Sequence, residues 1–181
     1  MMNNLSTKSE LRAALIAARR KMPADVKAQA DARIIARLAG WIDAHQVKLL
    51  GGYLAMAGEP ELSPLYATLA ERGVALAMPV VVERHHPLRF VPWQPGDPLA
   101  RDASGTLAPT AREGFVQPDA IIAPCVGYTD DKLRLGYGGG YFDRTLAQSP
   151  RPLAVGVAYA MAKVAFAADA YDMPLDDILT D

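Results

Sequence analysis

The sequence contains a single cysteine, Cys125, among 181 residues. One thiol can form no intramolecular disulfide and no cage of thiolate ligands around a metal, which favours a reducing compartment. Also absent are an apolar run of about 18 residues and the hydrophobic segment of a secretion signal. We therefore expect a cytoplasmic protein that has no contact with membranes.

A surplus of either charge is missing too. The 19 Lys and Arg residues nearly balance the 20 Asp and Glu residues, which gives a formal net charge of −1. Proteins that bind nucleic acids usually carry a clear basic excess, so we expect no nucleic-acid partner. The charges are nevertheless segregated. Residues 1–40 carry eight Lys and Arg against three Asp and Glu, whereas residues 169–181 carry five Asp and no cation.

Hydrophobic residues make up 51% of the chain, and at this length they supply a self-sufficient core. No internal repeat, low-complexity stretch or linker divides the sequence. We therefore expect one domain over residues 1–181, and we expect it to act as a monomer.

Two amphipathic helices are expected at the start of the chain. Thr7 and Glu10 have the spacing of a capping box, and apolar residues then recur at helical intervals over about four turns. Lys8, Arg12 and Arg19 fall along one face of this helix, beside the apolar stripe. Pro23 ends the first helix, and a second is expected over residues 24–44.

Farther along the chain, the period of the apolar residues changes. Apolar runs at residues 49–56 and 74–82 flank a short helix at 65–72, which is the pattern of two parallel strands joined by a crossover helix. Further strands are expected at 88–93, 120–126 and 153–158, and further helices at 141–148 and 161–170; the segment 83–118 is otherwise irregular. The pattern predicts an α/β protein with a mostly parallel central sheet.

Residues 134–144, Arg-Leu-Gly-Tyr-Gly-Gly-Gly-Tyr-Phe-Asp-Arg, carry the strongest chemical signal. Four glycines in five positions lie between an expected strand and an expected helix, where backbone amides can approach phosphate oxygens closely. Arg134 and Arg144 add positive charge, and Asp143 offers an oxygen ligand for a phosphate-bound Mg²⁺. A flexible loop or a tight turn would use the same glycines, but the charged flanking residues favour a phosphate site.

The two commonest phosphate motifs are absent. The chain has no G-x-x-x-x-G-K-[ST] sequence, which a P-loop requires. A dinucleotide motif G-x-G-x-x-G that began at Gly136 would need glycine at position 141, where Tyr141 stands. The spacing therefore excludes an ordinary P-loop kinase or dinucleotide-dependent dehydrogenase.

The glycine loop resembles the signature of the 5-formyltetrahydrofolate cyclo-ligases, which are also called methenyltetrahydrofolate synthetases. Further segments agree with that family in their order and spacing, so the resemblance covers nearly the whole chain: Lys8-x-x-Leu11-Arg12, Tyr53 to Glu59, Pro124 to Arg144, and Asp172-x-Pro174-x-Asp176. The resemblance implies a single-domain, Rossmann-like layered fold with helices flanking the sheet. It also implies ATP- and Mg²⁺-dependent cyclisation of 5-formyltetrahydrofolate to 5,10-methenyltetrahydrofolate, in which the formyl oxygen is phosphorylated and ADP and phosphate are released.

The resemblance assigns roles to residues position by position. It implies that Arg134 and Asp143 are catalytic and that Asp143 and Asp172 hold Mg²⁺. The implied ATP site comprises Lys8, Arg12, Arg134, Leu135, Gly136, Tyr137, Gly138, Gly139, Gly140, Tyr141 and Phe142. The implied folate site comprises Leu54, Glu59, Tyr137, Gly138, Gly139, Gly140 and Tyr141. Small-molecule substrates, a reduced folate and ATP, are thus the expected partners.

Plainer interpretations of these residues stay open at this point. Lys8 and Arg12 would suit a solvated basic face, and the tyrosines of the loop would suit a packed core. Glu61 would serve in a turn as well as Glu59, and only the spacing from Tyr53 favours Glu59.

One departure from the family supports an alternative function. Related proteins often have Lys where Gly139 stands, so one cation near the phosphates is missing here. The alternative is a catalytically weakened relative that binds folate or nucleotide as a binding or regulatory module. In either case we predict that folding brings the basic first helix and the acidic C-terminal segment together at the glycine loop.

Overall fold

The computed structural model describes residues 7–101 and 106–181. It begins with helices α1 (Lys8–Arg20) and α2 (Ala24–Ala44), as the sequence predicts. The expected capping box is present, because the Thr7 side chain accepts from the Glu10 amide and the Glu10 carboxylate accepts from the Thr7 amide. Among the described residues, no helix is long and apolar enough to cross a membrane.

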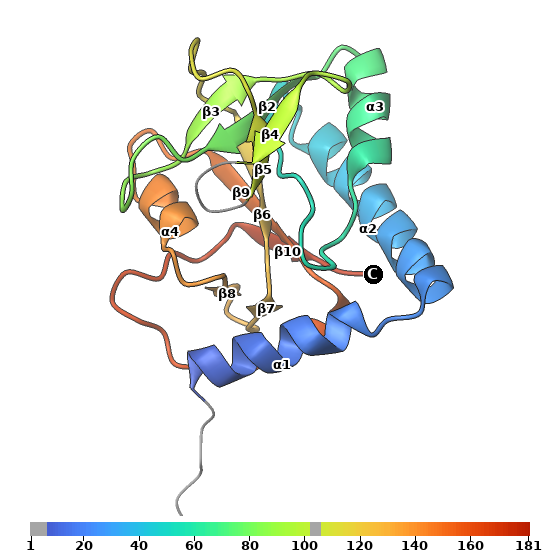
Figure 1. Ribbon diagram of the computed structural model, residues 1–181, viewed down its shortest axis with the longest axis vertical. Coiled ribbons are helices and arrows are strands. Elements are labelled where there is room, and N and C mark those ends of the chain that lie inside the picture. The colour runs from blue at the N-terminus through green and yellow to red at the C-terminus, as the bar shows by residue number, and fades with distance from the viewer. Residues whose placement is uncertain (1–6, 102–105) are drawn as a thin grey trace, which may run out of the picture.

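A six-stranded sheet forms the centre of the protein (Figure 1). Its strands lie in the order β10-β9-β6-β1-β2-β3. All neighbouring pairs are parallel except β2 and β3, which are antiparallel. Their bounds are β1 (Leu49–Gly51), β2 (Ala75–Val80), β3 (Arg89–Pro92), β6 (Ala120–Pro124), β9 (Leu153–Val157) and β10 (Asp177–Leu179). The prediction of an α/β fold with a mostly parallel sheet is confirmed.

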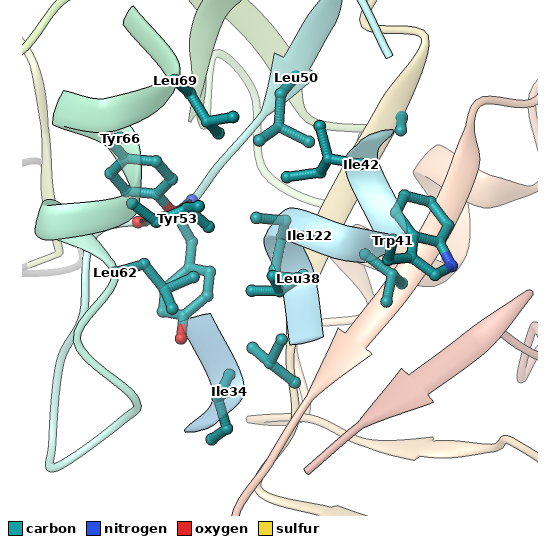
Figure 2. Packing of buried hydrophobic residues seen from close by; sticks show 14 of the residues in the cluster. Ile34, Leu38, Trp41, Ile42, Leu50, Tyr53, Leu62, Tyr66, Leu69 and Ile122 are labelled. Atoms are coloured by element: carbon teal, nitrogen blue, oxygen red, sulfur yellow. Dashed lines mark hydrogen bonds between the residues drawn. The ribbon is translucent and has the colours of Figure 1, made fainter. Parts of the chain in front are cut away.

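Helices α2 and α3 (Ser63–Glu71) cover one face of the sheet. Figure 2 shows the side chains of both helices meeting those of β1 and β6, with Leu69 near Leu50 and Leu38 near Ile122; Ile34 belongs to the same buried cluster. All five side chains are fully buried, and each contributes about 1.5–3 kcal/mol to the hydrophobic stabilisation of the fold. This cluster fixes the positions of β1 and β6, at whose ends the site lies.

Alternate residues of the same strands face the opposite side. Ile121 and Ala123 of β6 pack there against Leu146 of α4 (Tyr141–Leu146) and against Leu175 of the C-terminal segment. This alternation is the period of two that a strand imposes on its side chains. The C-terminal segment therefore covers the second face together with α4.

The predicted helix at 161–170 is wrong. The structure has one turn of 3₁₀-helix, η1 (Ala160–Ala162), and irregular chain after it. Lys163 forms a bridge with Tyr128, and the amide of Val164 donates to the Tyr128 carbonyl at 2.9 Å. A short alanine-rich stretch stabilises a helix only weakly, so these tertiary hydrogen bonds determine its conformation.

The predicted strand at 49–56 is too long, since β1 ends at Gly51. The backbone of Tyr53 pairs with a side chain instead of a neighbouring strand, because the Tyr66 hydroxyl donates to its carbonyl and accepts from its amide. Two small hairpins were not predicted. They are formed by β4 (Leu99–Arg101) with β5 (Leu107–Pro109) and by β7 (Gly127–Tyr128) with β8 (Arg134–Leu135).

The strand order reverses direction between β1 and β6. The chain passes from β1 to β2 on one side, and it later returns to place β6 and β9 on the other side. In open α/β sheets, ligands bind beyond the carboxyl ends of the strands at such a switch point. A ligand-binding site is therefore expected at the segments that follow β1 and β6.

Candidate active site

A cavity of about 930 Å³ lies at the carboxyl ends of β1, β2 and β6. This volume is within the range of pockets that bind cofactors and substrates of ordinary size. Every residue that the sequence suggests for the site lines it: Lys8, Arg12, Leu54, Glu59, Arg134, Leu135, Gly136, Tyr137, Gly138, Gly139, Gly140, Tyr141, Phe142, Asp143 and Asp172. The structure thus brings together residues separated by more than 160 positions in the chain.

The glycine loop connects β8 to α4 and forms one wall of the cavity. Gly138 and Gly140 adopt φ angles of +93° and +66°, which side chains rarely tolerate. A Cβ atom at Gly136 would overlap with the guanidinium group of Arg134, which folds over this glycine. Because α4 has only six residues, its dipole contributes less than a long helix would, and side-chain cations supply most of the positive potential.

Three arginines surround the loop. The Arg134 side chain is only 7% exposed, and its Nη2 lies 3.4 Å from Asp143 Oδ2. Arg12 Nε donates to the Gly136 carbonyl at 2.5 Å, and Arg144 Nη1 donates to the Gly139 carbonyl at 2.8 Å. These contacts orient the loop and place three guanidinium groups along the cavity wall.

The basic helix α1 and the acidic C-terminal segment meet in the cavity, as predicted from the charge distribution. Lys8 Nζ lies 2.6 Å from Asp169 Oδ2 and 2.7 Å from Asp172 Oδ2. Burial alone would lower the pKa of Lys8, but the hydrogen bonds to Asp169 and Asp172 outweigh it and raise that pKa. Burial alone would raise the pKa of Asp172, yet the hydrogen bonds from Lys8 and from the Asp169 amide lower it.

Of the carboxylates that line the cavity, Glu59, Asp143, Asp169 and Asp172, the sequence resemblance assigns Asp143 and Asp172 to a metal ion. Each of these two side chains is about 19% exposed. No group of three or more His, Cys, Asp or Glu side chains within residues 7–101 and 106–181 could hold a metal without help. Mg²⁺ usually binds one or two carboxylates and completes its shell with substrate phosphates and water. The donor set therefore fits a Mg²⁺ ion that arrives with a phosphorylated substrate.

Glu59 is buried in the turn after β1, where it is 2% exposed. Its Oε2 accepts from the Met56 amide at 2.9 Å, and its Oε1 accepts from the Tyr137 hydroxyl at 2.7 Å. Burial raises the pKa of Glu59, although these two hydrogen bonds and the charges of Arg19 and Arg134 oppose the increase.

Glu61 has a different environment from that of Glu59. It is exposed, and its Oε1 accepts from the amide and the hydroxyl of Ser63 at the start of α3. The structure therefore distinguishes two glutamates that the sequence separates only by their spacing from Tyr53. Glu59 faces the cavity, and Glu61 accepts from Ser63, the first residue of α3.

Arg19 lies behind the cavity wall, and the sequence interpretation assigned no role to it. It is buried, its Nε donates to the Ala57 carbonyl at 2.8 Å, and its Nη2 donates to the Tyr137 hydroxyl. The sequence does place Arg19 seven residues after Arg12, and this spacing puts both arginines on one face of the helix. Periodicity alone does not show which residue of a basic face becomes buried.

Aromatic and apolar groups complete the cavity. Tyr137 is 41% exposed, while its hydroxyl is held by Glu59 and Arg19, so its ring presents a surface to a ligand. Leu54, Tyr141 and Phe142 line the cavity as well. Burial raises the pKa of the Cys125 thiol to about 12, so Cys125 stays protonated and packs as a small core residue.

The fold and the cavity together define a Rossmann-like α/β protein whose site combines a cationic glycine loop with a carboxylate-containing apolar pocket. The sequence profile of the 5-formyltetrahydrofolate cyclo-ligase family matches residues 4–181. The chain belongs to this family.

Individual relatives agree with this assignment. The chain is 27% identical to the 5-formyltetrahydrofolate cyclo-ligase of Haemophilus influenzae over 97% of its own length and 98% of that protein. The 5,10-methenyltetrahydrofolate synthetase structure from Aquifex aeolicus matches with a TM-score of 0.78 at 28% identity, over 94% of this chain and 88% of that one. The corresponding Mycoplasma pneumoniae structure matches with a TM-score of 0.80 over 97% and 99%; at 23% identity it supports the fold alone.

Proposed function

We propose that this protein catalyses the ATP- and Mg²⁺-dependent cyclisation of 5-formyltetrahydrofolate to 5,10-methenyltetrahydrofolate, with release of ADP and phosphate. Membership of the cyclo-ligase family supports the reaction. The observation that carries the proposal is the composition of one cavity, which holds phosphate-binding cations and a buried carboxylate beside exposed aromatic rings. These are the groups that a reaction between a triphosphate and a pterin requires.

The triphosphate would lie along the glycine loop. Arg134, Lys8 and Arg12 face this part of the cavity from β8 and α1, and the loop from Leu135 to Phe142 follows it. Arg134 is nearly buried, so its charge acts on a phosphoryl group with little screening by solvent. We assign to Arg134 the stabilisation of charge on the transferred phosphoryl group.

Asp143 and Asp172 would hold the Mg²⁺ ion that accompanies ATP. When bound, Mg²⁺ neutralises charge on the phosphate oxygens. In the structure these carboxylates are paired with Arg134 and Lys8, respectively. Each acid therefore lies beside a cation that is assigned to the phosphates.

The pterin would lie at the end of the cavity that Glu59 and Leu54 line. A carboxylate accepts hydrogen bonds from the amino and N–H groups of a pterin. The rings of Tyr137 and Tyr141 offer faces for stacking, and Gly138, Gly139 and Gly140 leave room between the two substrates. This arrangement would direct the formyl group toward the phosphates.

The chemistry then needs two steps. The formyl oxygen attacks the γ-phosphorus of ATP and ADP departs, which leaves a phosphate ester on an iminium carbon. N10 of the folate adds to that carbon, the phosphate departs, and N10 loses its proton. Because the formyl oxygen alone is a poor leaving group, phosphorylation is what permits ring closure. The protein contributes chiefly by positioning the reactants and by stabilising charge.

A spectral assay tests the proposal. Purified protein should convert 5-formyltetrahydrofolate to a product that absorbs in the near ultraviolet, and only when MgATP is present. Asp143→Ala should abolish the conversion, whereas Asp130→Ala, which removes an exposed carboxylate 80% accessible to solvent, should retain it. Conversion without nucleotide would refute the mechanism. Calorimetry that detects folate binding without ATP hydrolysis would instead favour a binding or regulatory module, the function that Gly139 suggests.

We also propose that residues 1–181 act as one domain. The cavity takes residues from Lys8 near the start to Met173 near the end, and the family profile extends over residues 4–181. A fragment that lacks α1 or the C-terminal segment would therefore lose part of the site.

A further inference from the structure

Arg19 is a charged residue buried in the last turn of α1. Only 4% of its surface is exposed. Arginine is seldom buried to this extent unless nearby groups compensate its charge and accept its hydrogen bonds. The next residue, Arg20, is exposed, as expected for this residue type. The burial of Arg19 therefore depends on the groups that it contacts.

Those contacts join three separate parts of the site. Nε donates to the Ala57 carbonyl in the turn after β1 at 2.8 Å. Nη2 donates to the Tyr137 hydroxyl in the glycine loop and lies 3.9 Å from Glu59 Oε1. Helix α1, the turn that carries Glu59 and the glycine loop thus meet at one guanidinium group.

The guanidinium group also sets the direction of the hydrogen bonds. Arginine can only donate, so the Tyr137 oxygen must accept from Arg19 and direct its own proton to Glu59 Oε1. The other oxygen of Glu59 accepts from the Met56 amide. Glu59 is consequently held as an acceptor at both oxygens.

This arrangement is unfavourable for stability in two respects. Arg19 Nη1 is buried and has no hydrogen-bond partner within the described part of the chain. Ala57, whose carbonyl accepts from Arg19, has a φ angle of +50°, which is uncommon for a residue with a side chain. Strained or unsatisfied groups concentrate at functional sites.

We propose that Arg19 is a positioning residue for the folate substrate, which acts through Tyr137 and the Ala57 carbonyl to hold the Glu59 carboxyl group as an acceptor directed into the cavity. Arg19 does not line the cavity, so its effect on the substrate passes through Glu59. The inference rests on the proposed folate-binding role of Glu59. It assigns to the basic face of α1 a function in folate binding, in addition to the phosphate contacts proposed for Lys8 and Arg12.

The ionisation of Glu59 depends on groups from several elements. Arg19 of α1 and Arg134 of β8 favour the carboxylate, as do the hydroxyl of Tyr137 and the amide of Met56. Three further titratable groups interact electrostatically with Glu59 and are buried and neutral: Tyr53, Tyr66 and Cys125. Removal of Arg19 leaves Arg134 as the cation that favours the carboxylate among these groups.

The test compares Arg19→Gln with Arg20→Gln, a matched change of the exposed neighbour. Isothermal calorimetry would measure binding of 5-formyltetrahydrofolate and, separately, of Mg²⁺ with a non-hydrolysable ATP analogue. We expect Arg19→Gln to weaken folate binding by about tenfold or more and nucleotide binding by less than about twofold. Arg20→Gln should change neither. Folate affinity of Arg19→Gln should also begin to fall at a higher pH than in the wild type.

Two further variants keep the result interpretable if Arg19→Gln folds poorly. Arg19→Lys retains the positive charge and should restore part of the folate affinity, although an ammonium group cannot reproduce both contacts. Tyr137→Phe removes the hydroxyl between Arg19 and Glu59 and should weaken folate binding without a comparable loss of stability.

The outcomes separate this inference from the proposed function. If Arg19→Gln weakens folate and nucleotide binding equally, or leaves the pH profile of folate binding unchanged, Arg19 has only a structural role and the inference is wrong. If the wild-type protein binds folate and converts it, yet Arg19→Gln and Tyr137→Phe bind it normally, the inference fails and the proposed function stands. If the wild-type protein does not bind 5-formyltetrahydrofolate, both fail.

Discussion

Glu59→Gln is the substitution that most directly tests the folate end of the cavity. The amide is nearly the same size as the carboxylate, but its NH₂ group faces a donor in either orientation, the Met56 amide or the Tyr137 hydroxyl, so one of these two contacts is lost as well. Each carboxylate oxygen of Glu59 accepts one hydrogen bond from the protein and has one further acceptor position. By the acceptor capacity of a carboxylate, a pterin bound as proposed would donate at most one hydrogen bond to each oxygen.

The expected loss follows from these two positions. A hydrogen bond to a charged group contributes about 1.5–3 kcal/mol, and one to a neutral group contributes about 1 kcal/mol. Glutamine keeps one neutral acceptor and presents a donor where the other oxygen stood. The net loss is about 2–5 kcal/mol, or about 30- to 4,000-fold in kcat/KM for 5-formyltetrahydrofolate. KM for ATP should change by less than about twofold.

The pH dependence gives an independent measure. Burial raises the pKa of Glu59, and only the carboxylate accepts from two N–H groups. Folate affinity of the wild type should therefore fall as the pH drops through that raised pKa. Glu59→Gln has no carboxylate at this position, so this decline should be absent from its pH profile.

Glu61→Gln is the matched control for this experiment. Glu61 lies two residues away and is exposed at the start of α3, so its variant should keep wild-type kinetics. Thermal unfolding of both variants would detect a loss of folded protein. Wild-type kcat/KM for folate in Glu59→Gln, or an equal loss for ATP, would refute the reasoning.

Three other substitutions test the remaining parts of the site. Gly136→Ala places a methyl group against the Arg134 guanidinium, so kcat/KM for ATP should fall at least about tenfold while calorimetry finds unchanged folate binding. Asp172→Asn removes a partner of Lys8 and should lower the free energy of unfolding in urea by less than about 1 kcal/mol. Because the pKa of Asp172 is lowered in the folded protein, the wild type should keep this whole advantage at neutral pH and lose it as the pH falls through that pKa. Thr7→Ala removes the cap of α1 and should cost about 1 kcal/mol in urea unfolding.

Each of these expectations has a contrary result. Equal losses for folate and ATP in Gly136→Ala would show that the whole loop has changed, not the position of Arg134. A stability difference that persists at acid pH in Asp172→Asn would show that the charge of Asp172 is not its cause. Unchanged urea unfolding in Thr7→Ala would show that tertiary contacts hold the start of α1 without its cap.

The fold was predictable where local pattern and tertiary structure agree. The change from helical to strand periodicity near residue 48 predicts β1, α3 and β2 because these strands are buried on both faces and the helix on one. The prediction of a helix at 161–170 is wrong because the helix propensity of its alanines is weaker than the hydrogen bonds that the hairpin β7–β8 makes with the same segment. The short hairpins have too few residues to show a period.

The position of the glycine loop on the cavity wall was predictable from residue spacing, and its phosphate-binding role stays a prediction. Contiguous glycines between two arginines indicate a phosphate loop even before the fold is known. The burial of Arg19 and its contact with Tyr137 are not visible in the same way, because they depend on where α1 crosses the loop. A difference of two residues separates Glu59 from Glu61, and only the three-dimensional turn shows which of them faces the cavity.

The net charge of −1 includes two oppositely charged segments that the fold brings together. The charges of the basic first helix and of the acidic C-terminal segment neutralise each other by direct contact, because Lys8 lies within hydrogen-bond distance of Asp169 and Asp172 in the cavity. Without these acids, Lys8, Arg12 and Arg134 would repel one another around an open pocket. The pairing limits that repulsion and leaves cations beside the carboxylates that would hold Mg²⁺. A balanced composition therefore argues against an extended polyanion, but it is compatible with a compact triphosphate that binds where the two charged ends meet.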